Sequence, residues 1–162
     1  MPTDYPVTSG VRVLRERKIP FTPCLYRYED HGGAPRAARE LKLPLHSVVK
    51  TLVFETDLRE PLLVLMHGDL EVSTKRLART IGAKQVIPCS PNTAQKHTGY
   101  SVGGICPFGT RTPMPVYAEK TIFALDTIYV NGGKRGFLVG IAPGDITRVV
   151  ATTEVEVGIP QQ

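Results

Sequence analysis

The sequence predicts one α+β domain whose β-sheet is mixed or largely antiparallel and is flanked by short helices. Two neighbouring apolar runs, residues 48–56 and 62–67, are separated only by turn residues, a pattern typical of a buried antiparallel strand pair. Helical segments surround this pair without the regular strand–helix alternation of a doubly wound fold. With 162 residues, 41 % of them hydrophobic, the chain can bury one core, and we expect residues 1–162 to form a single domain.

The first third of the chain predicts two helices and one strand. A helix is expected over residues 8–19, because Thr8 can cap it and Pro20 cannot continue it. Residues 21–28 are rich in aromatic side chains and predict a strand. A second helix, residues 35–41, opens at a proline, which the first turn of a helix tolerates.

Two more helices and a β-rich region are predicted beyond the strand pair. One helix is capped by Ser73 or Thr74 and stopped by Gly82, and another is capped by Ser90 and stopped by Gly99, since glycine adopts the left-handed conformation that ends a helix. From residue 100 onward the pattern changes to short β-prone runs and glycine-rich turns. The elements expected there are strands at 101–105, 121–125, 127–130, 137–141 and 154–157, a turn at 131–136 and a helical turn from Asp145.

The composition of the chain predicts where the protein is located in the cell and what kind of partner it binds. The chain has no apolar segment of the roughly 20 residues that span a membrane, and no secretory signal, so we expect a cytoplasmic protein without membrane contact. Cys24, Cys89 and Cys106 show neither disulfide nor zinc-binding spacing. A net charge of +5 favours a polyanionic partner without identifying it.

Lys50 is the first candidate functional residue. In an extended strand its side chain shares a face with Val48 and Leu52, where a charged group must find a partner, reach water or lose its proton. It is therefore either a site residue or a strand-end lysine whose stem reaches the surface.

Two glycine-rich segments are candidates for close approach to a ligand. Gly103 and Gly104 interrupt a β-prone run, so they mark either a β-bulge or backbone amides that bind a carbonyl oxygen or a phosphate. Residues 131–136 include Lys134 and Arg135, so this segment is either a solvated hairpin turn or a loop around an anion.

Familiar catalytic and metal-binding motifs are missing from the sequence. His31, His46, His67 and His97 lack the spacing of metal ligands, and we expect each to be a surface or packing residue. No serine elbow or P-loop occurs. Cys106 would be a nucleophile only beside a base, and a buried structural thiol is the alternative.

Together these segments resemble the YbaK/EbsC family and the editing domains associated with prolyl-tRNA synthetases. The resemblance spans about residues 8–150 and implies a free-standing aminoacyl-tRNA deacylase, built on a curved mixed sheet and using neither metal nor organic cofactor. It rests on four segments in the family's order and spacing: Tyr28–Glu29, VVKTL around Lys50, TGYSVGGICPFG at Thr98–Gly109 and IYVNGGKRG at Ile128–Gly136.

The resemblance implies catalytic roles for three residues. Lys50 matches the lysine on which the family's activity depends, and Gly103 matches the first glycine beside the aminoacyl group. As a hypothesis, Lys50 and the Gly103–Gly104 backbone would polarise the ester carbonyl and stabilise the oxyanion. The attacking group would be a bound water or, for a cysteine substrate, its own thiol.

The resemblance also implies binding roles. Tyr28, Asn131 and Cys106 would contact the aminoacyl group, whereas Lys134 and Arg135 would contact phosphates of the tRNA acceptor end. The resemblance implies aminoacyl-tRNA as the RNA partner and prolyl-tRNA synthetase as a protein partner.

Two departures from the family pattern leave the amino acid open. The branch that removes cysteine from tRNA(Pro) carries a serine and an aspartate where this chain has Asn131 and Leu138, and leucine cannot form a hydrogen bond. Cysteine remains the first hypothesis. One alternative is a deacylase that cleaves alanyl- or another small aminoacyl-tRNA by water attack. Another is a catalytically silent module that binds the acceptor end through Lys75, Arg76, Lys134 and Arg135.

Overall fold

The structure is a computed structural model in which residues 4–161 are described. Short helices and strands alternate irregularly along the chain, and no helix among the described residues has the length and apolar character needed to cross a bilayer. The elements are α1 (Ser9–Glu16), β1 (Thr22–Leu25), α2 (Gly33–Leu41), η1 (Leu45–Ser47), β2 (Val49–Thr56), β3 (Pro61–His67), β4 (Leu70–Val72), α3 (Thr74–Ile81), β5 (Val86–Pro88), α4 (Pro91–Thr98), β6 (Val116–Glu119), η2 (Lys120–Ala124), β7 (Ile128–Lys134), β8 (Phe137–Ile141), α5 (Asp145–Val149), β9 (Thr152–Val155) and β10 (Gly158–Pro160).

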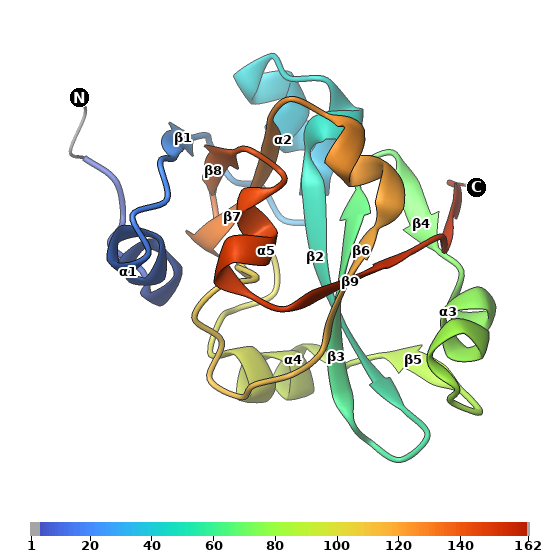
Figure 1. The fold of residues 1–162 in the computed structure, drawn as a ribbon. Coiled ribbons are helices and arrows are strands. Elements are labelled where there is room, and N and C mark those ends of the chain that lie inside the picture. The colour runs from blue at the N-terminus through green and yellow to red at the C-terminus, as the bar shows by residue number, and fades with distance from the viewer. Residues whose placement is uncertain (1–3, 162) are drawn as a thin grey trace.

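The strands of the described region form three sheets around a central β2–β3 hairpin (Figure 1). The largest has the order β5-β2-β3-β6-β9 and is mixed: β2 is antiparallel to β3 and β5, whereas β6 is parallel to β3 and β9. The sheets β1-β8-β7 and β10-β4 are antiparallel. A single parallel bridge between Val48 and Tyr129 joins β7 to the start of β2. The predicted α+β class with a mixed, largely antiparallel sheet is confirmed, although the sheet is divided into three.

Both faces of the β2–β3 hairpin are buried, which explains its continuous apolar sequence. Leu63 and Leu65 point to a core shared with α1 and α4, whereas Leu62 and Val64 point to a second core under α3. Alternate residues of a strand lie on opposite faces, so a strand with two covered faces needs apolar residues throughout. A third apolar cluster lies between α2 and the β1-β8-β7 sheet.

The capping residues place two helices as the sequence predicts. The hydroxyl of Ser73 accepts a hydrogen bond from Arg76 N at 3.2 Å and caps α3, and Ser90 does the same for α4. Both helices end at a glycine with positive φ. The first helix is shorter than predicted, because Lys18 adopts φ +56° and the helix ends at Glu16.

Two predicted strands are wrong. Residues 101–105, hereafter the glycine loop, form a turn rather than a strand, because Gly103 has φ +94° and Gly104 N donates to Ser101 O at 2.8 Å. Residues 121–125 largely belong to the 3₁₀ helix η2, in which Ile122 is fully buried. Glycine conformation and tertiary packing override the local β-propensity in these two segments.

The remaining differences concern short strands and strand ends. β4, β5, β6 and β10 have three or four residues each, too few to show an alternating pattern. The turn expected at 131–136 is confined to its last residues, because β7 continues to Lys134 through a β-bulge. The closing strand expected at 154–157 is β9, which lies at 152–155 and precedes β10.

Candidate active site

The glycine loop packs against the β7–β8 hairpin so closely that both of its glycines are required. A Cβ added to Gly103 would lie 2.8 Å from the hydroxyl oxygen of Tyr28. A Cβ added to Gly104 would lie 2.8 Å from Arg135 N and 2.9 Å from the carbonyl carbon of Lys134. The Tyr28 side chain at Gly103 and the backbone of Lys134 and Arg135 at Gly104 therefore leave no room for anything larger than glycine.

Asn131 joins this hairpin to the glycine loop. Its Oδ1 accepts hydrogen bonds from Gly133 N at 2.7 Å and Lys134 N at 3.1 Å, which shapes the bulge of β7. Its Nδ2 donates to Gly103 O at 3.0 Å. Both ends of the amide are therefore used in holding the two segments together.

Arg135 contacts both the glycine loop and Tyr28. Its Nε donates to Val102 O at 2.9 Å, and its guanidinium carbon lies 5.2 Å from the centroid of the Tyr28 ring, within cation–π range. Next to it is an open hollow of about 270 Å³. The residues that line this hollow are Ser101, Gly104, Gly133, Lys134 and Arg135.

Lys50 lies half-buried on β2, and its Nζ donates to Leu70 O at 2.5 Å. Burial lowers the pKa of this ammonium group, while the carboxylates of Glu71 and Asp69 act in the opposite direction. Among the described residues no hydrogen bond links Lys50 directly to the glycine loop.

The strand register nevertheless brings Lys50 to the face that carries Asn131. β2 and β7 run parallel where Val48 bridges Tyr129, and these two side chains belong to the same apolar cluster. Residues two positions further along each strand share that face, so Lys50 and Asn131 occupy equivalent places on neighbouring strands. The arrangement can present an ammonium group and a glycine backbone to one ligand.

Leu138 adds an apolar wall beside Asn131. The two residues are directly opposite each other on β8 and β7, and Leu138 is only 5 % exposed. It packs in the cluster that contains Ala37, Ala38 and Val48. The two departures from the family pattern are therefore neighbours in the structure.

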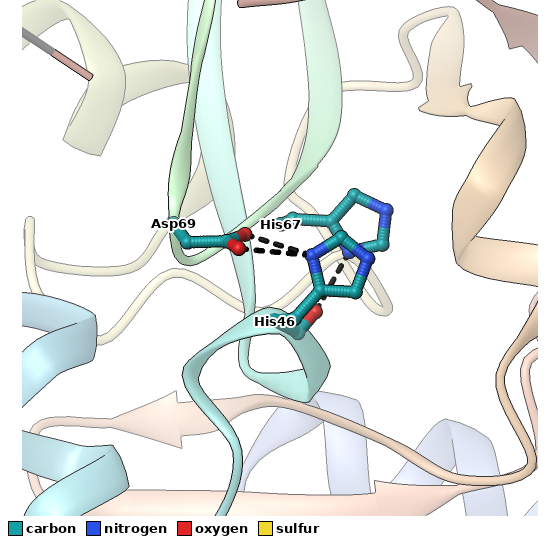
Figure 2. A group of neighbouring side chains, drawn as sticks. All are labelled: His46, His67 and Asp69. Atoms are coloured by element: carbon teal, nitrogen blue, oxygen red, sulfur yellow. Dashed lines mark hydrogen bonds and ion pairs between the residues drawn. The ribbon is translucent and has the colours of Figure 1, made fainter. Parts of the chain in front are cut away.

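Figure 2 shows a hydrogen-bonded group of His46, His67 and Asp69, which no motif in the sequence indicates. It lies near Lys50, since the Asp69 carboxylate acts electrostatically on the Lys50 ammonium group. His46 Nδ1 donates to the Asp69 carboxylate, at 2.9 Å from Oδ1 and 3.1 Å from Oδ2. His67 Nδ1 donates to His46 O at 2.7 Å, and His67 Nε2 lies 2.7 Å from Thr121 Oγ1. His67 is a packing residue, as predicted, but no sequence spacing indicates that the three side chains meet.

The geometry of this group does not fit a metal site, although its ligand atoms lie within 4.8 Å of one another. The two imidazole rings are stacked, with centroids 3.6 Å apart and an interplanar angle of 6°. A histidine binds a metal ion along the nitrogen lone pair, in the plane of its ring, and one ion cannot lie in two parallel planes at this separation. Both nitrogens of His67 already have hydrogen-bond partners.

Cys106 does not belong to the site. It is fully buried in the core beside Tyr100, and its Sγ accepts a hydrogen bond from Phe108 N at 3.4 Å. Burial raises the pKa of this thiol to about 12, so it carries no negative charge at neutral pH. The expectation that Cys106 contacts the aminoacyl group is wrong, because a residue without exposed surface cannot touch a substrate.

The Cys106→Ala variant is therefore expected to deacylate at a rate within about threefold of wild type. Its free energy of unfolding should fall by about 1–3 kcal/mol, because a buried sulfur atom is removed from the core. Single-turnover deacylation and urea unfolding measure the two effects. A stable variant without activity would instead identify Cys106 as a catalytic group.

The fold and the clustered residues define a small α+β domain in which a tyrosine and two glycine-rich segments pack together, with a half-buried lysine on the neighbouring strand β2. Residues 30–149 match the family model described as the aminoacyl-tRNA editing domain. Because this match covers most of the chain, the protein belongs to the aminoacyl-tRNA editing domain family. The predicted enzyme class, an aminoacyl-tRNA deacylase that acts in editing, is thereby confirmed.

Individual relatives agree with this assignment. The chain is 29 % identical over 137 residues to EbsC of Enterococcus faecalis, described as a candidate Cys-tRNA(Pro)/Cys-tRNA(Cys) deacylase, and the match covers 84 % of each protein. It is 31 % identical over 117 residues to the proline–tRNA ligase of Moorella thermoacetica, covering 70 % of this chain and 20 % of the ligase. A solved structure described as a candidate trans-editing enzyme for prolyl-tRNA synthetase has the same fold, with a TM-score of 0.80, 20 % identity and coverage of 98 % and 100 %.

Proposed function

We propose that this protein removes a mischarged small amino acid from tRNA in trans, with cysteine on tRNA(Pro) as the first substrate to test. The observation that carries the proposal is the grouping of Tyr28, Gly103 and Asn131, with Lys50 at the place on β2 that corresponds to Asn131 on β7. The similarity to EbsC supports cysteine, and its extent supports residues 1–162 acting as one editing domain.

In the proposed mechanism, Lys50 and the Gly103–Gly104 backbone stabilise the negative charge that develops on the ester carbonyl oxygen. Lys50 acts in its protonated form: burial lowers its pKa, and the neighbouring carboxylates of Glu71 and Asp69 oppose that shift and favour the charged group. The attacking group is a bound water or the thiol of a cysteine substrate. The attacking group adds to the carbonyl carbon and gives up its proton, which forms the oxyanion. When the carbonyl forms again, the bond to the ribose oxygen breaks and that oxygen takes up a proton.

The acceptor end of the tRNA would bind over the β7–β8 hairpin. Lys134 and Arg135 are exposed beside the hollow, where they can neutralise phosphate charges. Tyr28 would form one wall of the aminoacyl pocket. Prolyl-tRNA synthetase is the protein partner that the relatives support, because related domains occur within proline–tRNA ligases.

The apolar wall formed by Leu138 supports a second substrate class. A buried leucine offers no hydrogen bond to a thiol or hydroxyl group, so the pocket also suits a small apolar side chain such as that of alanine. Pockets separate side chains that differ by one methylene by only about 1–3 kcal/mol, so the two classes must be compared directly.

Single-turnover deacylation of tRNAs charged with cysteine, alanine, serine, threonine and proline tests the proposal. We expect one mischarged species to be cleaved at least about tenfold faster than correctly charged Pro-tRNA(Pro), which a difference of about 1.4 kcal/mol in barrier height produces. Cleavage of the cysteine or alanine ester would decide between the two substrate classes. Tight tRNA binding without any turnover would replace the proposal by the silent acceptor-end module.

A further inference from the structure

The hydrogen bond of Lys50 depends on a turn that is held by a histidine and an aspartate. Lys50 Nζ donates to Leu70 O, at the first residue of β4. Both carboxylate oxygens of the preceding residue, Asp69, accept a hydrogen bond from His46 Nδ1, as Figure 2 shows. His46 lies in η1, four residues before Lys50. The His46–Asp69 pair therefore ties the segment leading into Lys50 to the turn that receives its ammonium group.

Backbone packing leaves this turn little freedom. A Cβ added to Gly68 would lie 2.6 Å from Leu45 O and 2.7 Å from Val48 O, so the turn is in close contact with η1 along its backbone. Neither carbonyl can rotate away without moving η1 or the start of β2. A displacement of the turn would thus move Leu70 O relative to Lys50 Nζ.

His67 supports the His46–Asp69 pair by stacking on the His46 ring. Its ring is fully buried and stacks on His46, and its Nδ1 carries the proton because His46 O can only accept a hydrogen bond. Its Nε2 then accepts from the Thr121 hydroxyl. Burial lowers the pKa of His67, which favours this neutral tautomer at neutral pH. His46 is consequently held in place by His67 and oriented by Asp69.

We propose that His46 and Asp69 are positioning residues for Lys50: their pair fixes the Gly68–Leu70 turn so that Leu70 O holds the ammonium group in one direction. The proposal rests on the proposed function of Lys50. Asp69 also contributes a negative charge near Lys50, and Glu71 supplies a second one that the substitution of Asp69 leaves in place.

The test compares Asp69→Asn and His46→Gln with wild type in single-turnover deacylation. We expect the rate constant at saturating enzyme to fall by about ten- to a hundredfold, as for other small displacements of a catalytic group, while the enzyme concentration at half-saturation changes by less than about twofold. Asp69→Glu, which restores the carboxylate, should recover part of the rate. Asp126→Asn removes an exposed carboxylate and is the matched control, expected to behave as wild type.

A second measurement follows Lys50 itself and needs no activity. Competitive acylation followed by peptide mass spectrometry compares the labelling rate of Lys50 with that of the exposed Lys120 in the same sample. In Asp69→Asn and His46→Gln, Lys50 should react at least about threefold faster relative to Lys120, because its ammonium group is no longer held against Leu70 O. A variant that unfolds would be recognised by its melting curve, and the other variant then decides.

The outcomes separate this inference from the proposed function. Absence of turnover in wild type overturns the proposed function, while the labelling measurement still tests the positioning of Lys50. A wild type whose activity depends on Lys50, together with unchanged rates and unchanged labelling in both variants, overturns the positioning role alone. A loss that appears only as weaker tRNA binding also overturns it.

Discussion

The Lys50→Ala variant is expected to lose deacylation by about 10²–10³-fold in the single-turnover rate constant, the loss typical of removing one donor that stabilises an oxyanion. The ammonium group is half-buried, and its face of β2 is the one that continues to Asn131 on β7. Its electrostatic interaction with an oxyanion is stronger there than in bulk water, because fewer water molecules screen the charge. Binding of the tRNA should change little, since Lys134 and Arg135 remain.

The fold should survive this substitution. Burial lowers the pKa of Lys50 below its ordinary value, so the folded state holds the proton less tightly than the unfolded state does. The charged lysine therefore does not favour folding at neutral pH, and its stabilising contribution would appear only as the pH rises. Loss of the bond to Leu70 O acts in the opposite direction. We expect the melting temperature to change by only a few degrees.

Lys120→Ala is the matched control for Lys50→Ala, because Lys120 is an exposed lysine that pairs with the exposed Glu156. It should retain the wild-type rate. If Lys50→Ala deacylates within about threefold of this control, Lys50 has no catalytic role and the proposed mechanism is wrong.

The parts of the fold that the sequence predicts well are those whose signals are local. Caps such as Ser73 and Ser90 act within three residues, and the apolar run of β3 is visible because both of its faces are covered. The sequence predicts a strand for the glycine loop, whereas the structure has a turn in which Gly103 adopts a positive φ and packs against Tyr28. That contact joins residues 75 positions apart, so no window of the sequence contains it.

In the candidate site, too, the sequence indicates the local motifs but not the contacts between distant residues. The resemblance gives Gly103 and Gly104 a catalytic role and Asn131 a binding role; the structure joins Asn131 to Gly103 by a hydrogen bond and packs Gly104 against Lys134 and Arg135. Cys106 follows them closely in sequence but points into the core, since the turn redirects the chain after Gly104. The pair of His46 and Asp69 depends on the register of β2 and β3 and on the turn after β3, which residue spacing does not reveal.

The Gly104→Ala variant is expected to lose deacylation by about ten- to a hundredfold while remaining folded. Its Cβ would lie 2.8 Å from Arg135 N, 2.9 Å from Lys134 C and 3.1 Å from Lys134 Cα. These are backbone atoms, so no side-chain rotation relieves the overlap, which typically costs about 1–3 kcal/mol when a packed site is overfilled. Movement of the glycine loop away from the hairpin would relieve it, and would stretch the bond from Asn131 Nδ2 to Gly103 O.

A displaced glycine loop carries its backbone groups away from the face of Lys50, so the rate should fall even though Lys50 is intact. Gly144→Ala is the control, because a Cβ at Gly144 meets nothing within 4 Å and the residue has an ordinary helical φ of −61°. Single-turnover rates and melting temperatures of both variants separate catalysis from stability. A Gly104→Ala enzyme as fast as Gly144→Ala would mean that the ester carbonyl does not lie against this loop, and the oxyanion would then have to be stabilised by Lys50 without the glycine backbone.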